Sequence, residues 1–327
     1  MRILVLHSDV APDASADEQD TVITARAIAE ALESCGHRAS LAPFAFDPHA
    51  LRKLIAEYRA DAVFNMVEAI FGQGELAPVV PTLLEKLNVP FTGCPSAPMA
   101  LAGDKALAKT VLRLAGLPTP QWHEAPFGEA RDGVRYIVKS VTEDASLGLD
   151  GNAVVTGREV VRARAEFCRK QYGGRWFAEA YVEGREFNIS VLEENGQPHV
   201  LPIPEMVFHN WPPGHPRIVS YDAKWAETST DYNETIRQFR SEADDPVLHK
   251  RLTQLAEATW RLFRLKGFAR IDFRVTEAGE PTILEINPNP CLEPGSGFAA
   301  AASEAGMNYA ETVARILQAA LYPYSLI

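Results

Sequence analysis

Hydrophobic and polar positions alternate in two short runs in the last third of the chain and predict a β-hairpin. The first run covers residues 268–275 and the second covers residues 282–287, with turn residues at 277–280. Successive side chains of a strand point to opposite faces, so Arg270, Asp272 and Arg274 share one face, and Glu285 and Asn287 share one face of the partner strand. If these faces coincide, two carboxylates and an amide lie together, which suits Mg²⁺. A surface hairpin with its charges in water is the alternative.

The first hundred residues alternate between apolar runs of strand length and segments with helical periodicity. We predict strands at residues 2–7, 37–44, 62–67 and 89–92, helices at 21–35, 48–59 and 78–87, and an acidic loop at 9–20. This alternation predicts a doubly wound α/β unit with a parallel sheet, in which ligands bind beyond the carboxyl ends of the strands. The loop that begins at Glu68 and contains Gly72 and Gly74 lies at that edge. An ordinary turn is the alternative there.

A mixed unit follows, with a helix at residues 105–114 that Asp104 can cap. Further strands are predicted at residues 134–140, 152–156, 176–181, 187–192 and 199–205, and further helices at 157–171, 246–265 and 309–322. Lys139 ends a strand just before the loop 143–148, whose backbone N–H groups and Ser146 hydroxyl could hold phosphates. A plain surface loop is the alternative. The long irregular segment 206–225 is of a kind that usually has a working role.

Composition narrows the function classes. The chain has 327 residues, 46% hydrophobic and 23% charged, which is ordinary for a soluble protein of two or three domains. Its net charge of −11, without a basic run, argues against a nucleic-acid or membrane surface as partner. The four cysteines are far apart and form no C-x-x-C pair, so neither a zinc site nor a disulfide framework is indicated. We expect a cytoplasmic protein.

Six motifs in a fixed order then carry a resemblance. They read G-D-K-A-L-A-K (103–109), Y-I-V-K with E-D-A-S-L-G (136–148), A-E-A-Y-V-E-G-R-E-F (178–187), Y-D-A-K-W (221–225), R-I-D-F (270–273) and L-E-I-N-P-N-P (284–290). This order resembles the ATP-grasp superfamily, and within it the D-alanine–D-alanine ligase branch, from Ile3 to about Leu317. The resemblance implies an ATP-grasp fold, α/β with an α+β nucleotide-binding part, and three domains at residues 1–102, 103–182 and 183–327.

The resemblance also implies roles for individual residues. Lys105 and Lys139 match the lysines near the α- and β-phosphates, and Lys224 matches a lid lysine that reaches the γ-phosphate. The implied adenine and ribose contacts are Glu179, the backbone at Tyr181 and Val182, and Glu186. Asp272, Glu285 and Asn287 match the ligands of two Mg²⁺ ions, with Mn²⁺ as a substitute. Arg270 matches the residue that steadies an oxyanion, and Ser146 supplies a catalytic loop hydroxyl.

The implied reaction joins a small-molecule carboxylate to an amine through an acyl phosphate, but the substrate positions depart from the family pattern. The stretch Ser8–Asp13 lacks the glycine-rich start, Ala145 replaces a serine, and Trp225 replaces a tyrosine. The acceptor side carries Glu68, Cys291 and Ser296. We therefore expect a different amino acid or small carboxylate as substrate, without a nucleic-acid or membrane partner. A genuine D-alanine–D-alanine ligase, a non-ligating ATP-binding protein and an enzyme that stops at phosphoryl transfer are the alternatives. Relatives of this kind are commonly homodimers.

Overall fold

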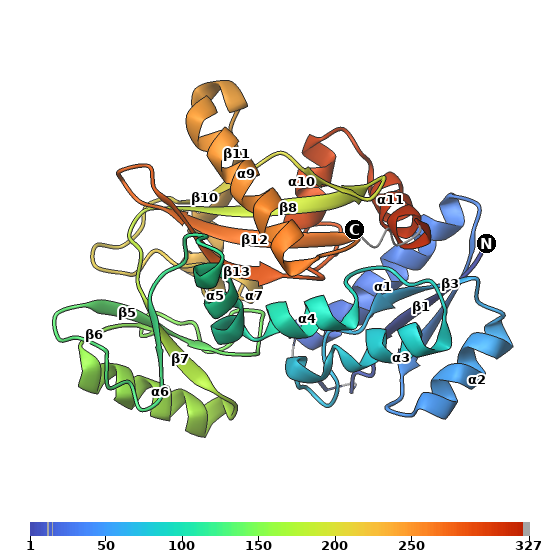
Figure 1. The fold of residues 1–327 in the computed structure, drawn as a ribbon, viewed down its shortest axis with the longest axis horizontal. Coiled ribbons are helices and arrows are strands. Elements are labelled where there is room, and N and C mark those ends of the chain that lie inside the picture. The colour runs from blue at the N-terminus through green and yellow to red at the C-terminus, as the bar shows by residue number, and fades with distance from the viewer. Residues whose placement is uncertain (12, 15, 323–327) are drawn as a thin grey trace.

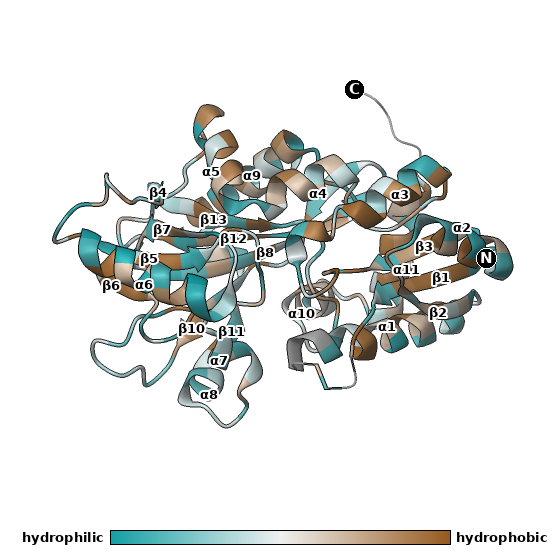
Figure 2. Cartoon of the chain, turned by 90° about the horizontal axis from the view of Figure 1, so that it is seen from below, coloured by the Kyte–Doolittle hydropathy of each residue, from teal (hydrophilic) through white to brown (hydrophobic). Residues whose placement is uncertain are grey.

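The computed structural model describes residues 1–11, 13–14 and 16–322, so Pro12 of the predicted Ser8–Asp13 stretch lies outside it. The first unit is a parallel sheet in the order β2-β1-β3, formed by β1 (Arg2–Ser8), β2 (Arg38–Phe44) and β3 (Ala62–Met66). Helix α1 (Ala16–Ser34) covers one face, and α2 (Pro48–Tyr58) and α3 (Val79–Leu87) cover the other. Figure 2 shows the apolar residues concentrated on β1 and β3 between these layers. The doubly wound prediction is confirmed.

Two predictions for this unit are wrong in detail. The expected strand at residues 89–92 is reduced to a single bridge between Val63 and Phe91. The expected acidic loop is helical from Ala16 onward, because acidic residues in a first turn favour the helix N-terminus. A short turn of 3₁₀-helix, η1 (Gly74–Leu76), follows the loop after β3.

The middle unit is an antiparallel sheet in the order β4-β7-β5-β6. Its strands are β4 (Trp122–Glu124), β5 (Arg135–Ser140), β6 (Val154–Thr156) and β7 (Trp176–Ala180). Helix α6 (Arg158–Tyr172) packs against one face through Val161, Ala165 and Cys168. Helices α4 (Ser96–Gly103) and α5 (Lys105–Leu114) lead into this unit, and Asp104 caps α5 by accepting a hydrogen bond from the Leu107 N–H.

The last unit is an antiparallel sheet in the order β11-β10-β8-β12-β13, with β9 paired to β8 (Figure 1). Its strands are β8 (Arg185–Glu194), β9 (Gln197–Val200), β10 (Pro204–Phe208), β11 (Thr235–Phe239), β12 (Phe268–Val275) and β13 (Pro281–Asn287). The single strand predicted at 199–205 is therefore split in two. The break includes Pro202, which has no N–H to give to the ladder.

Helices complete the last unit and join it to the first. Helix α9 (Pro246–Phe263) buries Leu252, Ala256 and Trp260 against Ile271 and Phe273 of β12. Helices α10 (Gly297–Glu304) and α11 (Tyr309–Leu321) pack with α1 in one continuous core. The remaining short elements are α7 (Tyr221–Trp225), α8 (Thr230–Glu234) and η2 (Glu242–Asp244). None of the described helices is long and apolar enough to cross a membrane. The predicted boundaries at 102/103 and 182/183 stay predictions.

Candidate active site

The hairpin β12–β13 brings two carboxylates directly opposite each other. Asp272 pairs with Glu285 in the ladder, and Arg270 pairs with Asn287. A bulge follows between Asp272 and Phe273, where Leu284 is the extra residue on β13. The bulge lets Ile283 join Phe273 in the core while Asp272, Glu285 and Asn287 remain on the opposite face. The predicted convergence of these three side chains is therefore present in the geometry.

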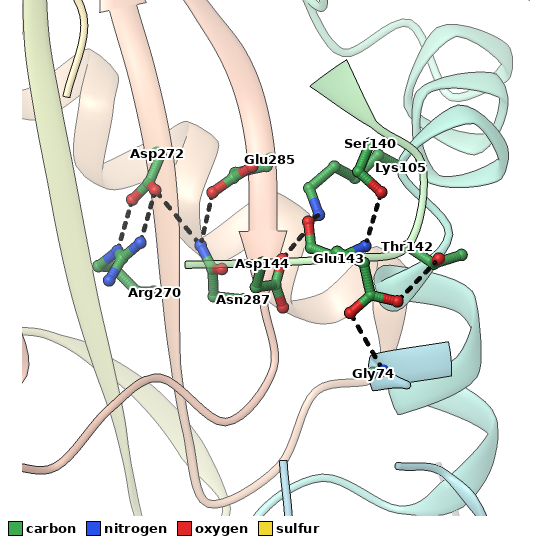
Figure 3. Close-up of polar contacts among 10 residues, drawn as sticks. All are labelled: Gly74, Lys105, Ser140, Thr142, Glu143, Asp144, Arg270, Asp272, Glu285 and Asn287. Atoms are coloured by element: carbon green, nitrogen blue, oxygen red, sulfur yellow. Dashed lines mark hydrogen bonds and ion pairs between the residues drawn. The ribbon is translucent and has the colours of Figure 1, made fainter. Parts of the chain in front are cut away.

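Hydrogen bonds link the members of this group (Figure 3). The Arg270 guanidinium donates to both oxygens of Asp272, at 2.8 and 2.9 Å. The Asn287 amide nitrogen donates to Asp272 Oδ2 at 3.3 Å and to Glu285 Oε1 at 3.4 Å. A donor thus already bridges the two carboxylates, at the position where a cation would be bound. Each carboxylate oxygen has two lone pairs, so Asp272 can keep Arg270 and still serve a metal ion.

This donor set fits magnesium. In the described part of the chain, no three His, Cys, Asp or Glu side chains form a group that could hold a metal ion. The candidate set is therefore two carboxylates and one amide, all hard oxygen donors once the Asn287 amide is turned to present Oδ1. Mg²⁺ keeps its other positions for water and phosphate, so a set of three protein ligands is sufficient.

A second group, of lysines and one glutamate, lies at the meeting point of the middle and last sheets. Glu179 on β7 is 1% exposed, and its Oε1 lies 3.0 Å from Lys139 Nζ. Its other oxygen forms an ion pair with Lys109 of α5. Lys109 also donates to the carbonyl of Leu284 at 2.8 Å, the residue of the bulge. The carboxylate predicted to contact adenine is thus held by two buried ammonium groups.

Burial and neighbouring charges shift the pKa values of the two carboxylates of the hairpin. Burial raises the pKa of Glu285, but Lys105, Lys139, Lys224 and Arg270 outweigh it and lower the pKa to about 2. For Asp272 burial is the larger effect, and its pKa lies above the usual carboxylate value despite Arg270. Glu285 is therefore ionised at neutral pH and provides the fixed negative charge among the surrounding cations.

One cavity collects most of the predicted nucleotide and metal residues. Its lining includes Lys139, Ser146, Glu179, Tyr181, Val182, Glu186, Lys224, Arg270, Asp272 and Glu285. Lys105 lies beside this cavity, where its Nζ donates to the Glu143 carbonyl at 2.9 Å and to Asp144 Oδ1 at 2.7 Å. Burial and the nearby Arg270 lower the pKa of Lys224, the predicted lid lysine. Four carboxylates and four cationic side chains thus line a single space; the cations are Lys139, Lys224, Arg270 and Arg274.

Two loops close over the cavity and are joined to each other. The Ser146 hydroxyl donates to the Val219 carbonyl at 2.9 Å, and the Tyr221 N–H donates to the Leu149 carbonyl at 2.9 Å. The Trp225 indole N–H donates to the Ala145 carbonyl at 3.4 Å. Ala145 and Trp225, the two positions that depart from the family pattern, therefore meet. A backbone acceptor replaces the hydroxyl network that the resemblance implied.

The predicted substrate residues lie outside this cavity lining and are divided between two places. Glu68 follows β3, and its N–H donates to the Ser8 hydroxyl at 3.1 Å. Cys291 is near it: its Sγ lies 3.3 Å from Asp20 Oδ2, and burial with the charges of Glu68 and Asp20 raises the Cys291 pKa. Ser296 caps α10, where its hydroxyl accepts from the Ala299 N–H at 3.3 Å. Glu68 and Cys291 thus face the first unit, and Ser296 belongs to the turn after the hairpin.

Sequence reasoning missed several charged residues of the site. Lys109 appeared only as the last residue of the 103–109 motif, and Arg274 only as sharing the face of Asp272. Arg274 is buried, forms an ion pair of 2.8 Å with Glu186 and lines the cavity. The signal for Arg274 was available, because alternation placed it on the site face. Lys109 gave no such signal, since its partners Glu179 and Leu284 are 70 and 175 residues away.

Comparisons with known proteins agree with this geometry. A sequence model of the family "D-ala D-ala ligase C-terminus" matches residues 117–318. A D-alanine–D-alanine ligase of Synechococcus sp. (strain JA-3-3Ab) is 31% identical over 94% of this chain and 91% of its own length. The ligase of Moorella thermoacetica is 30% identical over 94% of this chain and 97% of its own length.

Solved structures agree in fold. The D-alanine–D-alanine ligase of Bacillus anthracis, crystallised with ATP, superposes with a TM-score of 0.76 over 98% of this chain and 97% of that one. At 20% identity this likeness concerns the fold, which is ATP-grasp. The match over residues 117–318, together with relatives at 30% and 31% identity, establishes the family. The chain belongs to the D-alanine–D-alanine ligase family of the ATP-grasp superfamily.

Proposed function

We propose that this protein is an ATP- and Mg²⁺-dependent ligase that joins an amino acid or small carboxylate other than D-alanine to an amine. Enzymes of this family are ATP-dependent ligases that form carbon–nitrogen bonds, and the chain is one of them. The observation that supports a different substrate is the contact between Trp225 and Ala145. It replaces the serine and tyrosine hydroxyls expected beside the donor amino acid with an indole and a methyl group.

The chemistry follows from the groups around the cavity. A carboxylate is a poor electrophile, so phosphoryl transfer from ATP first converts it to an acyl phosphate. Lys105, Lys139 and Lys224 would neutralise the polyphosphate, which an acidic protein otherwise repels. Glu186, held by Arg274, would accept the ribose hydroxyls. Asp272, Glu285 and Asn287 would hold Mg²⁺, which supplies charge neutralisation of the transferred phosphoryl group.

The second half of the reaction is attack by the amine and loss of phosphate. Arg270 would stabilise the oxyanion of the tetrahedral intermediate, since Asp272 fixes its guanidinium by two hydrogen bonds. An acyl phosphate hydrolyses readily, so water must be excluded during its lifetime. The joined loops at Ser146–Val219 and Tyr221–Leu149 would provide that cover.

Two alternatives remain for the test. The relatives from Synechococcus and Moorella carry the name D-alanine–D-alanine ligase, which favours that reaction for this chain as well. A non-ligating ATP-binding protein is disfavoured by the buried carboxylate of Asp272 and the half-buried carboxylate of Glu285 opposite it, because such paired acids are costly to keep without a bound cation.

A panel of carboxylic acids and amines, assayed for ADP release in the presence of Mg²⁺, separates these functions. We expect ADP release only when both an acid and an amine are present, with D-alanine alone a poor substrate pair. Efficient turnover with D-alanine as both partners would favour the cell-wall enzyme. ADP release with one partner alone would indicate a kinase, and no release with any pair would contradict ligase activity.

A further inference from the structure

A guanidinium from β11 lies against the turn that leads into α10. Arg237 donates to the Gly295 carbonyl at 3.4 Å. A Cβ placed at Gly297 would be only 3.6 Å from Arg237 Nη2, so the guanidinium lies directly on the backbone of this turn. The turn contains Ser296, the residue predicted to contact the amine substrate.

Arg237 belongs to the same face of the sheet as the catalytic groups. It is opposite Met206 in the ladder, Met206 is also opposite Glu186, and Glu186 is opposite Arg274. Directly opposed residues of a sheet share a face, so Arg237 projects to the side that carries Arg270 and Asp272. Burial and the neighbouring positive charge of Arg270 lower the pKa of Arg237, and the negative charge of Glu293 offsets them only in part.

The three arginines of this face differ in their partners. Arg270 is paired with Asp272 and Arg274 with Glu186, both within 2.8 Å. Arg237 is half-buried, and in the part of the chain that the structure describes no carboxylate oxygen lies within 4.0 Å of it. Glu293, whose negative charge acts on Arg237 without direct contact, accepts the Gly295 N–H at 2.6 Å. A partly desolvated cation without a counter-ion is costly, and a bound anion would offset that cost.

We propose that Arg237 is a specificity-determining residue that selects an amine substrate with a second negative group, as in an acidic amino acid. The inference rests on the proposed ligase function. The N-terminus of α10 would hold one carboxylate of the amine substrate with the backbone N–H groups of Gly297 and Phe298, because the Ser296 and Ala299 N–H groups already donate within the turn. Arg237 adds a full positive charge next to that turn. The side-chain carboxylate of an acidic amine substrate would pair with this charge.

The test compares isosteric amines in both stereochemical forms, glutamate with glutamine and aspartate with asparagine. A charge-assisted hydrogen bond predicts that the acidic amine is preferred by roughly 10- to 100-fold in kcat/KM. Arg237→Gln should abolish this preference, so that the ratio of kcat/KM for the acidic amine to kcat/KM for the neutral amine falls to about one. Arg240→Gln is the matched control, because it removes the same charge next to the same strand, where the guanidinium is bound to Glu205 at 2.6 Å. It should keep the preference.

Calorimetric binding of the same amines, in the presence of a non-hydrolysable ATP analogue, gives a readout that does not need turnover. Phosphoserine compared with serine distinguishes a phosphate from a carboxylate as the second group. Equal affinity and equal kcat/KM for acidic and neutral amines in the wild type would overturn the inference, as would an unchanged preference in Arg237→Gln. Absence of ADP release with every acid–amine pair would instead contradict the ligase function, and the binding experiment would still decide the role of Arg237.

Discussion

The proposed nucleotide end and the proposed substrate end of the candidate active site differ in how their charged side chains are paired. At the nucleotide end, Glu179 is held between Lys109 and Lys139, and Arg270 is held by Asp272. At the substrate end, Arg237 has no carboxylate within 4.0 Å among the described residues, and the Trp225 indole N–H donates to the backbone carbonyl of Ala145. Internal ion pairs hold the side chains of the proposed nucleotide end in place before a ligand binds. The substrate end keeps its unpaired groups for whatever it binds.

Removal of the Glu285 charge should have the largest effect on activity. We expect Glu285→Gln to lower kcat by about 10³-fold or more, since the variant loses the ionised ligand among four cations. Steady-state ADP release measures this, and circular dichroism should show an unchanged fold. Glu280→Gln, in the exposed turn of the same hairpin, is the control and should turn over normally. Comparable activity of the two variants would exclude Glu285 from the metal site.

The next effect concerns stability at the nucleotide end. Glu179→Gln leaves the buried ammonium groups of Lys109 and Lys139 without their anion, and such a loss costs about 3–4 kcal/mol of unfolding free energy. Urea unfolding followed by tryptophan fluorescence is the measurement. Glu183→Gln serves as the matched change, because Glu183 is 65% exposed and pairs only at the surface with Arg135. If both variants unfold at the same urea concentration, the internal pairs do not preorganise this end.

A smaller effect is expected at the joined loops. Trp225→Phe removes the indole N–H that the Ala145 carbonyl accepts, while most of the ring packing is retained. One neutral hydrogen bond is worth about 1 kcal/mol, so kcat/KM should fall about fivefold, with added hydrolysis of the acyl phosphate. The ratio of ADP released to amide formed measures how much acyl phosphate is lost to hydrolysis. A ratio that stays at the wild-type value would show that this contact does not exclude water.

The smallest effect on stability is expected at Glu205, which is paired with Arg185 and Arg240 outside both ends of the site. It serves as a reference for the larger effects. Burial raises the pKa of Glu205, but hydrogen bonds from Arg185 and Arg240 outweigh it and hold the pKa below 4.5. The pKa of Glu205 is lower in the folded protein than in the unfolded chain. Ionised Glu205 therefore stabilises the fold at pH values above its unfolded pKa, and this stabilisation is lost as the pH falls through its folded pKa. Between pH 5 and 3, Glu205→Gln should therefore lose less stability than the wild type. The difference should be about half a kcal/mol after screening, as measured by thermal unfolding across that range.

The sequence predicted the regular parts of the fold well. Alternation grouped Glu285 with Asn287 on one face of β13 and put Asp272 on one face of β12, and the ladder shows that these two faces coincide. Helical periodicity found α2, α5, α9 and α11 to within two residues. Helices α4, α7, α8 and α10 and strands β4 and β11 were missed. Helix α10, with its run of alanines, has little amphipathic pattern, and β11 lies at the edge of the sheet.

Contacts between residues far apart in the sequence were the main limit on what could be predicted. The bulge at Leu284 cannot be read from residues 281–287 alone, because it depends on which partner each residue meets across the ladder. The same holds for Arg237, whose contact with Gly295 joins positions 58 residues apart. Motif order predicted which residues form the nucleotide site, but the partners of each charge are set by tertiary packing.

The Leu284 bulge also divides the hairpin into two segments that pair in different registers. Ladder pairs before it, from Arg270–Asn287 to Asp272–Glu285, keep one register, and pairs from Phe273–Ile283 to Val275–Pro281 keep another. The connecting turn at residues 276–280 is exposed and belongs to the second part. A fluorophore or a short peptide inserted there would therefore leave the pairing of Asp272 with Glu285 intact. This turn is thus a suitable attachment point for following the enzyme during turnover.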